Sequence, residues 1–300
     1  MADRRLQVFH AVAKQASFTR AAETLFMSQP AVTSQVKQLE EQFRVRLFER
    51  RHGSVTLTPA GELVLSYAER ILALSDELEA RLADMTEEMR GTLRVGATPT
   101  IAGFLLGDAL GEFNARHPQV RVRLVVANAA EVERRVAGRE LDVGLLDAPV
   151  TTPGLACASC GEDEMVAICS PDYPLAGSAK VKPRALAEYE HVAREPGSGS
   201  RVAAESWFAG KGIAADALKI QMELGGLEPL KAVVATGLGF AIVSRAAVAA
   251  ELAAGTLATV SLDPPLRRGL FAVTGEEHFR PRLVSAFAEF ARLKLKDLCA

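Results

Sequence analysis

The sequence contains no run of about 18 apolar residues, the length that a membrane-spanning helix needs. Its first ten residues, MADRRLQVFH, lack the apolar stretch of a secretory signal peptide. We therefore expect a cytoplasmic protein that has no membrane as a partner.

Cysteine and histidine are scarce, with four and five among 300 residues. Cys157 and Cys160 form a CxxC pair, but Cys169 and Cys299 stand at no matching spacing, and no two histidines have the spacing of metal ligands. Incidental reduced thiols are the expected interpretation, with a redox or metal role for the CxxC pair as the alternative. We predict no metal site and no cofactor.

Motifs of common enzyme classes are absent as well. There is no HExxH, GxSxG or complete GxGxxG pattern, and Glu205 stands where a Walker A motif ending at Lys211 would need glycine. Ser198 lies in a glycine-rich stretch, but no motif supplies a histidine to activate it. We predict no catalytic residue and expect that the protein is not an enzyme.

What the chain does have is an uneven distribution of charge. Residues 1–58 hold nine Lys or Arg and five Asp or Glu, a net charge of +4; because the whole chain carries −2, the remaining residues carry −6. A basic N-terminal part joined to an acidic body indicates a polyanionic partner for the first part only.

Helical spacing of apolar residues dominates the first sixty positions. It predicts helices over residues 3–15 and from Phe18, with Ser17 as N-cap, and a third helix from Ser28. The third helix carries an apolar stripe at helical spacing: Val32, Val36, Leu39 and Phe43. Residues 46–58 then alternate as a short two-stranded wing does.

A long helix is predicted to follow, from Thr58-Pro59 to about residue 90. At about 1.5 Å per residue it is too long for one small domain to cover. Its apolar residues follow a heptad pattern that Arg81 interrupts: Val64, Tyr67, Ile71, Leu74, Leu78 and Met85. This pattern predicts a linker that pairs with a second copy of the chain.

The third helix, which begins in the segment MSQPAVTSQVKQ, has an unusual polar face. Gln29, Thr33 and Lys37 lie at i, i+4 and i+8, Ser34 lies beside them, and no carboxylate occurs before Glu40. A helix that enters the DNA major groove needs hydrogen-bonding groups that can reach base edges. It should carry no carboxylates there, because the DNA phosphates would repel them. The alternative is a solvated helix face, but the preceding helix, the basic wing and the charge asymmetry favour DNA.

From Gly91 onward strands and helices alternate, which predicts an α/β body of two similar lobes. Polar and glycine residues follow predicted strands or open predicted helices, where ligands of open α/β folds bind. These residues are Thr98, Pro99, Thr100, Asn128, Gly197, Ser198, Gly199, Ser200 and Arg201. They predict a site for a small anionic effector; the alternative is that Thr98, Asn128 and Ser198 only cap helices.

Residues 4–62 resemble the winged helix-turn-helix of the LysR-type transcriptional regulators, without a gap. The segments SFTRAA, SQPAVTSQVKQLEE, LFER and LTPAG carry the resemblance. REPGSGSR and MELGGLEPLKAVVATGLGFAIVS further resemble the branch that contains regulators of cysteine metabolism and of carbon-fixation operons, except that Gly226 replaces a frequent Ser or Thr. The resemblance extends over essentially the whole chain.

The resemblance implies that a set of residues contacts an operator in double-stranded DNA: Ser17, Thr19, Arg20, Ser28, Gln29, Pro30, Thr33, Ser34, Lys37, Arg50 and Arg51. Two alternatives stay open: Arg20 could form an ion pair with Glu23, and the wing arginines Arg50 and Arg51 could serve solubility alone.

It also implies the fold class and the partners. We expect an α/β protein with a winged helix-turn-helix at 1–58, a linker helix at 59–90 and, at 91–300, an effector-binding domain that resembles periplasmic binding proteins. Lobe I would span about 91–161 and 267–300, and lobe II about 162–266. The effector is expected in the cleft between the lobes. The chain is expected to form a homodimer or homotetramer and to have RNA polymerase as a further partner. The alternative function is a small-molecule-binding protein whose N-terminal helices dock a protein.

Overall fold

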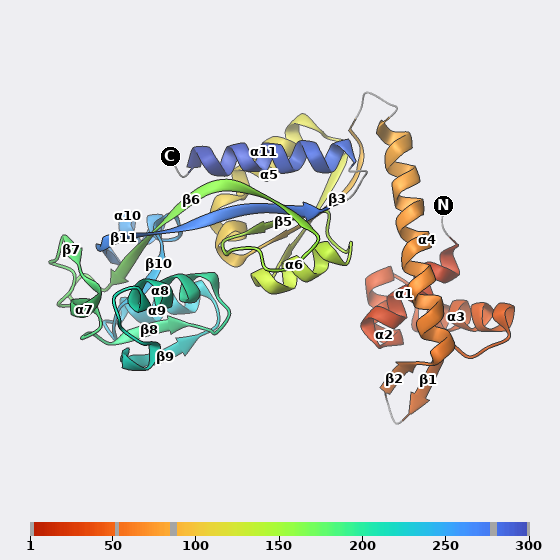
Figure 1. Ribbon diagram of the computed structural model, residues 1–300, viewed down its shortest axis with the longest axis horizontal. Helices are drawn as coiled ribbons and strands as arrows, with labels where there is room; N and C mark the ends of the chain where they lie inside the picture. The colour runs from red at the N-terminus through yellow and green to blue at the C-terminus, as the bar shows by residue number, and fades with distance from the viewer. Residues whose placement is uncertain (1–2, 52–53, 85–88, 277–280, 299–300) are drawn as a thin grey trace. The chain divides into compact units, whose positions relative to one another are not determined.

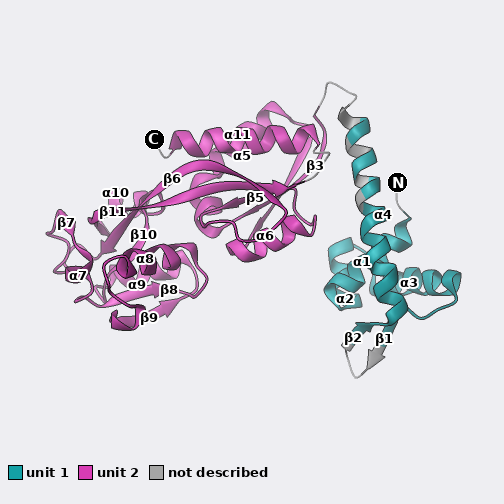
Figure 2. Cartoon of the chain, viewed as in Figure 1, with its two compact units in different colours: residues 1–88 teal, residues 89–300 magenta. Residues whose placement is uncertain are grey.

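The computed structural model describes residues 3–51, 54–84, 89–276 and 281–298. The chain divides into two compact units, residues 1–88 and 89–300 (Figure 2). The first consists of four helices and a two-stranded sheet; the second is a mixed α/β unit. Within the described ranges, no helix is both long and apolar enough to cross a membrane.

Unit 1 begins with the three predicted helices, α1 (Arg4–Gln15), α2 (Phe18–Leu25) and α3 (Gln29–Phe43). Each of the last two starts at a serine: the Ser17 hydroxyl accepts a hydrogen bond from the Arg20 N–H at 3.3 Å, and the Ser28 hydroxyl accepts one from the Ala31 N–H at 3.4 Å. Val32, Val36 and Leu39 are buried against α1 and α2, as predicted. Phe43 is 44% exposed, so its place in the buried stripe was wrong. The helix ends there, beyond the reach of its neighbours.

The wing consists of strands β1 (Phe48–Arg51) and β2 (Ser54–Leu57), which pair antiparallel. Phe48 packs the wing against the helices: its ring centroid lies 5.3 Å from that of Phe9 and 5.6 Å from that of Phe18. Glu40, the first carboxylate of α3, accepts a hydrogen bond from the Leu47 N–H at 2.7 Å. This acidic side chain therefore joins the third helix to the wing.

The long helix α4 runs from Pro59 to Asp84. Thr58 caps its start, since its hydroxyl accepts a hydrogen bond from the Gly61 N–H at 3.0 Å. The first turns pack on the other helices through buried Ala68 and through a 2.8 Å ion pair between Lys14 and Glu69. The helix was predicted to reach about residue 90; as described it ends at Asp84, and residues 85–88, which include Met85 of the heptad pattern, lie outside the described ranges.

Lobe I of unit 2 contains the parallel strands β3 (Gly91–Ala97), β4 (Val120–Val126) and β5 (Val143–Leu146). Its helices are the π-helix η1 (Ile101–Leu105), α5 (Gly107–Arg116), α6 (Ala129–Ala137) and the final α11 (Arg282–Leu298). One core packs α5 and α11 on the sheet, and a smaller one packs α6 (Figure 1). The carboxyl ends of β3, β4 and β5 therefore lie at one common edge.

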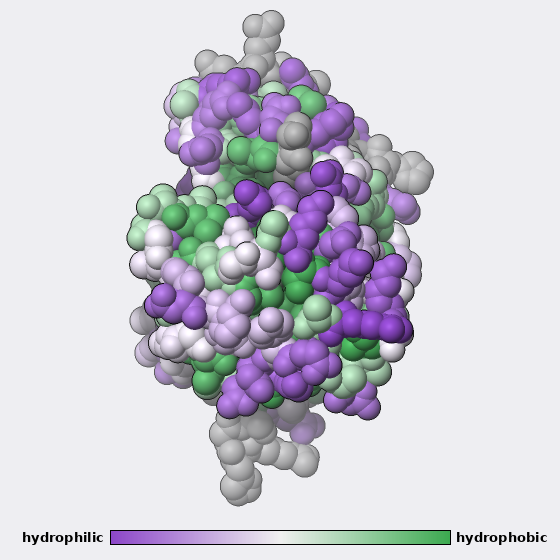
Figure 3. All heavy atoms as spheres, turned by 90° about the vertical axis from the view of Figure 1, so that its left-hand side faces the viewer, coloured by the Kyte–Doolittle hydropathy of each residue, from purple (hydrophilic) through white to green (hydrophobic). Residues whose placement is uncertain are grey.

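Lobe II contains β7 (Lys180–Val181), α7 (Pro183–Leu186) and the parallel pair β8 (His191–Arg194) and β9 (Ile220–Leu224). Between and after them come α8 (Gly199–Ala209), η2 (Ala215–Ala217), α9 (Leu227–Ala235), β10 (Ala241–Ser244), η3 (Arg245–Val248) and α10 (Ala249–Ala254). On the face of the molecule seen in Figure 3, hydrophilic and hydrophobic residues are interspersed.

Two long strands, β6 (Leu155–Cys169) and β11 (Ala258–Gly275), pass through both lobes as an antiparallel pair (Figure 1). The sheet order is β10-β6-β11-β5-β3-β4, so these strands join the lobe I sheet to β10 of lobe II. Each is longer than the apolar segments it contains, EMVAIC in β6 and ATVSL and LFAVT in β11. Cys157 and Cys160 lie on β6, one exposed and the other buried. Among the described residues no cluster of His, Cys, Asp and Glu could hold a metal ion.

Candidate functional site

The outer face of α3 presents the polar residues that the sequence singled out. Gln29, Ser34 and Lys37 are exposed and Thr33 is half-buried, while Val32 and Val36 face inward. Lys37 contacts Glu41 at 3.6 Å, but their side chains remain 74% and 63% exposed, so the ammonium group is available to another anion. The exposed start of the helix is neutral or positive over three turns. This is the charge pattern that close approach to phosphate requires.

The other predicted DNA contacts surround this face. Thr19 and Arg20 are exposed at the start of α2, and Pro30 is exposed in the first turn of α3. The Arg20 guanidinium donates to the Gln15 carbonyl at 2.5 Å, so its described partner is the end of α1 and not Glu23, the alternative that sequence had left open. The side chains of Arg50 and Arg51, in β1, lie outside the described residues.

Unit 2 contains a cavity of about 190 Å³ between its lobes. It is smaller than the roughly 300–1,000 Å³ of sites for drug-sized ligands, which restricts it to a small metabolite. Seven of the nine predicted effector residues line it, from the ends of β3 and β4 in lobe I and from the start of α8 in lobe II: Thr98, Pro99, Thr100, Asn128, Gly197, Ser198 and Gly199.

The helix-capping alternative holds for one of these side chains. Asn128 caps α6, because its side-chain oxygen accepts a hydrogen bond from the Glu131 N–H at 2.9 Å. Ser198 stands at the N-cap of α8 but forms no side-chain capping bond there. The Thr98 hydroxyl is buried and finds no hydrogen-bond partner among the described residues. Since buried hydroxyls are normally bonded, Thr98 has capacity for a ligand.

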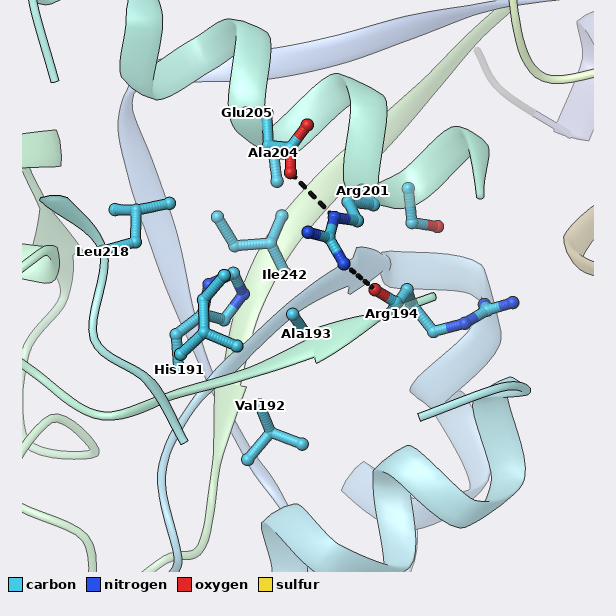
Figure 4. Close-up of a pocket in the computed structure, with 11 residues that line it drawn as sticks. His191, Val192, Ala193, Arg194, Arg201, Ala204, Glu205, Leu218 and Ile242 are labelled. Atoms are coloured by element: carbon cyan, nitrogen blue, oxygen red, sulfur yellow. Dashed lines mark hydrogen bonds and ion pairs between the residues drawn. The ribbon is translucent and has the colours of Figure 1, made fainter. Parts of the chain in front are cut away.

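Ser200 and Arg201 do not line the interlobe cavity, so their predicted placement was wrong. The Ser200 hydroxyl accepts a hydrogen bond from Arg268 at 3.2 Å. Arg201 points into lobe II, where it contacts Glu205 at 2.7 Å and donates to the Arg194 carbonyl at 3.0 Å (Figure 4). It also contacts Glu223 at 2.5 Å. The hydrogen bond with Glu205 raises the pKa of Arg201. Each residue of a helix is rotated by about 100° from the last, so Gly199 faces the cleft while Ser200 and Arg201, the next two residues of α8, point elsewhere.

Two charged residues of the cavity wall escaped sequence analysis. Arg194, at the end of β8, donates two hydrogen bonds to the Glu195 carboxylate, at 2.7 and 2.8 Å. Glu195 also accepts one from the Gly226 N–H at 3.4 Å. Gly226 adopts a φ of 112°, which a serine or threonine there would find strained. Gly226, where many relatives carry Ser or Thr, therefore supports the cavity wall through its backbone N–H.

Sequence analysis also missed a buried ionic network beside the cavity. Arg268 of β11 contacts Asp147, the residue after β5, at 2.5 Å, and Asp163 of β6 at 2.7 Å. The second oxygen of Asp163 accepts a hydrogen bond from the Ser244 hydroxyl at 2.8 Å. All three charged side chains are 4% exposed. The network ties lobe I, the crossing strands and lobe II together.

A second contact between the lobes lies on the same unit. The Lys231 ammonium of α9 lies 5.2 Å from the centre of the Phe104 ring in η1. Lys231 is also held by Glu228 at 2.8 Å and Glu251 at 2.6 Å. These contacts keep a cation of lobe II against an aromatic ring of lobe I.

Comparisons with known proteins agree with this architecture. Residues 4–62 match the protein family described as bacterial regulatory helix-turn-helix protein, lysR family. Residues 86–296 match the family described as LysR substrate binding domain. A probable RuBisCO transcriptional regulator of Cyanidioschyzon merolae is 32% identical over 95% of both chains. The RuBisCO operon transcriptional regulator of Allochromatium vinosum is 34% identical over 96% of this chain and 94% of that protein.

Solved structures share the fold. A full-length OxyR variant from Pseudomonas aeruginosa has a TM-score of 0.72 at 22% identity and covers 98% of this chain and 95% of its own. The CcmR regulatory domain of Synechocystis, in complex with 2-PG, has a TM-score of 0.62 at 24% identity and covers 70% of this chain and 98% of its own. The expected fold class and the resemblance to carbon-fixation regulators are confirmed. The chain belongs to the LysR family of DNA-binding transcriptional regulators.

Proposed function

We propose that this regulator binds its operator through α3 and the wing, senses a small anionic metabolite in the interlobe cavity, and thereby controls metabolic genes, in particular those of carbon fixation. The observation that carries the effector site is the convergence of seven predicted residues from both lobes on one cavity. The names of the relatives support the target genes. A regulator that binds an operator would act in the cytoplasm.

In DNA binding, α3 enters the major groove. Gln29, Thr33, Ser34 and Lys37 face the base edges, and Pro30 lies in the first turn beside them. The exposed residues of α2, Thr19 and Arg20, approach the backbone, as do the wing arginines Arg50 and Arg51. Ser17 and Ser28 already accept hydrogen bonds from backbone N–H groups, so their hydroxyls orient the helix starts and can only donate to a phosphate.

Replacement of Gln29 by alanine should weaken specific operator binding by about 1–3 kcal/mol, because a bidentate contact to a base is lost. A gel-shift titration against operator and random DNA measures the effect, which should be confined to the operator. Gln42→Ala is the matched control, since Gln42 is exposed at the far end of the same helix. Equal losses for both variants would contradict the groove assignment.

The effector contacts Thr98, Thr100 and Ser198 through its anionic group, with Arg194 as the nearest cation of the cavity wall. The CcmR regulatory domain was solved with 2-PG, a phosphate and carboxylate bearing compound, and 2-phosphoglycolate is therefore the first probe. Closure of the lobes on the ligand changes the arrangement of the DNA-binding units.

Thr98→Val should remove most of the rise in melting temperature that 2-phosphoglycolate produces, since binding stabilises by about 2.7 kcal/mol at a concentration of 100 Kd. Valine keeps the volume and removes the unpaired hydroxyl. Thr92→Val, an exposed position on the same strand, should keep the full shift. If Thr98→Val also keeps it, the Thr98 hydroxyl is not in the effector site.

The exposed face of α4 supports a dimer. It presents an exposed apolar stripe at helical spacing: Leu63, Tyr67, Ile71, Leu74, Leu78 and Leu82. Arg81, three residues after Leu78, interrupts the stripe before Leu82, and a second copy of the helix would cover its apolar residues. A homodimer would then place two α3 helices on successive half-sites of the operator, and a homotetramer would join two dimers.

In the alternative function the N-terminal helices dock a protein. The chain should then show no DNA affinity that falls steeply as salt is added. A DNA-binding head that neutralises several phosphates loses affinity steeply as salt rises. Genomic footprinting tests the rest of the proposal: protected sites should lie upstream of carbon-fixation genes, where contact with RNA polymerase can follow. Sites confined to other pathways would overturn the assignment of target genes.

A further inference from the structure

We propose that the effector carries a hydrogen-bond donor, a hydroxyl or an ammonium group, close to its anionic group, and that Asp147 selects it. This inference rests on the proposed effector cavity and adds a chemical requirement to it. A plain anion that offers only acceptor oxygens, 2-phosphoglycolate included, then binds more weakly than an analogue that carries the donor.

Asp147 is an unusual residue of the cavity wall. It follows β5 in lobe I, lines the cavity, and has a side chain that is 4% exposed. One carboxylate oxygen, Oδ2, accepts from Arg268 at 2.5 Å, whereas Oδ1 is buried and has no hydrogen-bond partner among the described residues. An ionised carboxylate can only accept hydrogen bonds. What is missing at Oδ1 is therefore a donor.

The neighbouring residues do not supply this donor. Arg268 donates to Asp147 Oδ2 and Ser200 through Nη1 and to Asp163 through Nε, while its Nη2 lies 2.7 Å from Asp163 and forms no hydrogen bond with Asp147 Oδ1. On the other side, α8 begins with Gly199, where a Cβ would lie only 2.7 Å from Asp147 Oδ1. Glycine thus lets the start of α8 approach the carboxylate without a side chain covering it. Asp147 Oδ1 is thus buried and unpartnered in the cavity wall, beside the start of α8.

The charges of the wall lead to the same requirement. Among the described lining residues the charged ones are Asp147, Glu195 and Arg194, and Arg194 is already paired with Glu195. An anion can be held by the hydroxyls of Thr98 and Ser198 and by the arginine. At Asp147, however, a second acceptor would face a carboxylate at close range. A ligand that displaces water from Oδ1 without replacing its hydrogen bond loses affinity.

Three probes with one carbon skeleton test this requirement. Phosphoserine carries an ammonium group, 3-phosphoglycerate a hydroxyl, and 3-phosphonooxypropanoate neither, while all three share the phosphate and the carboxylate. Titration calorimetry on the full chain should show the first two binding tighter than the third, on the order of 10- to 100-fold. Dissociation constants that agree within about threefold for all three would overturn the inference.

Asp147→Asn provides the second arm. The Arg268 guanidinium should hold the amide oxygen, which turns the amide NH₂, a donor, toward the cavity. The preference for the ammonium probe over 3-phosphonooxypropanoate should then vanish or reverse, while 3-phosphoglycerate, whose hydroxyl can also accept, keeps a smaller advantage. Because each result is a ratio on one variant, a general loss of stability cannot imitate it. Unchanged ratios would contradict the role of Asp147.

Failure of the parent proposal looks different. If the wild-type chain binds none of the three probes, the small-anion site itself is overturned, and the donor requirement with it. Binding with equal affinity leaves the anion site standing and removes only the requirement for a donor.

Discussion

Replacing Arg268 by methionine should lower the free energy of unfolding by about 3–5 kcal/mol, because it leaves two buried carboxylates without their cation. Arg268 contacts Asp147 at 2.5 Å and Asp163 at 2.7 Å, and Asp163 is its direct cross-strand neighbour on β6. Methionine preserves the length of the apolar stem but supplies no donor. Urea denaturation followed by circular dichroism measures the loss.

Arg267 offers a matched control next to it on β11. Its side chain is 62% exposed and lies 3.8 Å from Glu162, so the ion pair is weak and solvated. Arg267→Met should therefore change the free energy of unfolding by less than about 1 kcal/mol. Similar losses for the two variants would mean that the buried network contributes no more than a surface contact.

The second large effect concerns α4. Glutamate at both Leu74 and Leu78 should weaken the dimer by about 6 kcal/mol or more, because four leucines in the two chains lose apolar burial worth at least about 1.5 kcal/mol each. These side chains are 65% and 53% exposed in the single chain. Sedimentation analysis should then show monomers at concentrations where the wild type is oligomeric.

Ser66→Glu is the control for that experiment. Ser66 is exposed on α4 but stands off the apolar stripe, so added negative charge there should leave the oligomer intact. The double leucine variant should also lose affinity for a full operator more than for a half-site. If the leucine variant remains oligomeric, the helix stripe is not the pairing surface.

Much of the fold could be predicted because its signals are local. Unit 1 shows the serine caps, the short hairpin of the wing and the helical periodicity of its apolar residues. Each of these features is set by residues that are close in sequence. The lobe I wall of the interlobe cavity was also predictable, since Thr98 and Asn128 follow strands whose carboxyl ends must meet at one edge of the sheet.

The charged groups behind the cavity could not be predicted in that way. Arg268 is 105 residues from Asp163 and 121 from Asp147, and no motif links them. Ser200 and Arg201 were misplaced for a different reason: they continue a glycine-rich segment, but the turn of α8 directs them away from the cleft. The sequence indicated the segment 197–201. Which of its side chains reach the cavity depends on how α8 is rotated about its axis.

The crossing of both lobes by β6 and β11 limits how an effector can act. A pair of strands that is hydrogen-bonded through most of its length is stiff against wide opening, unlike two domains joined by flexible linkers. Its pairing is irregular between Ser261 and Leu266 and between Leu270 and Phe271. Deformation should concentrate at these two places, as a twist of one lobe on the other.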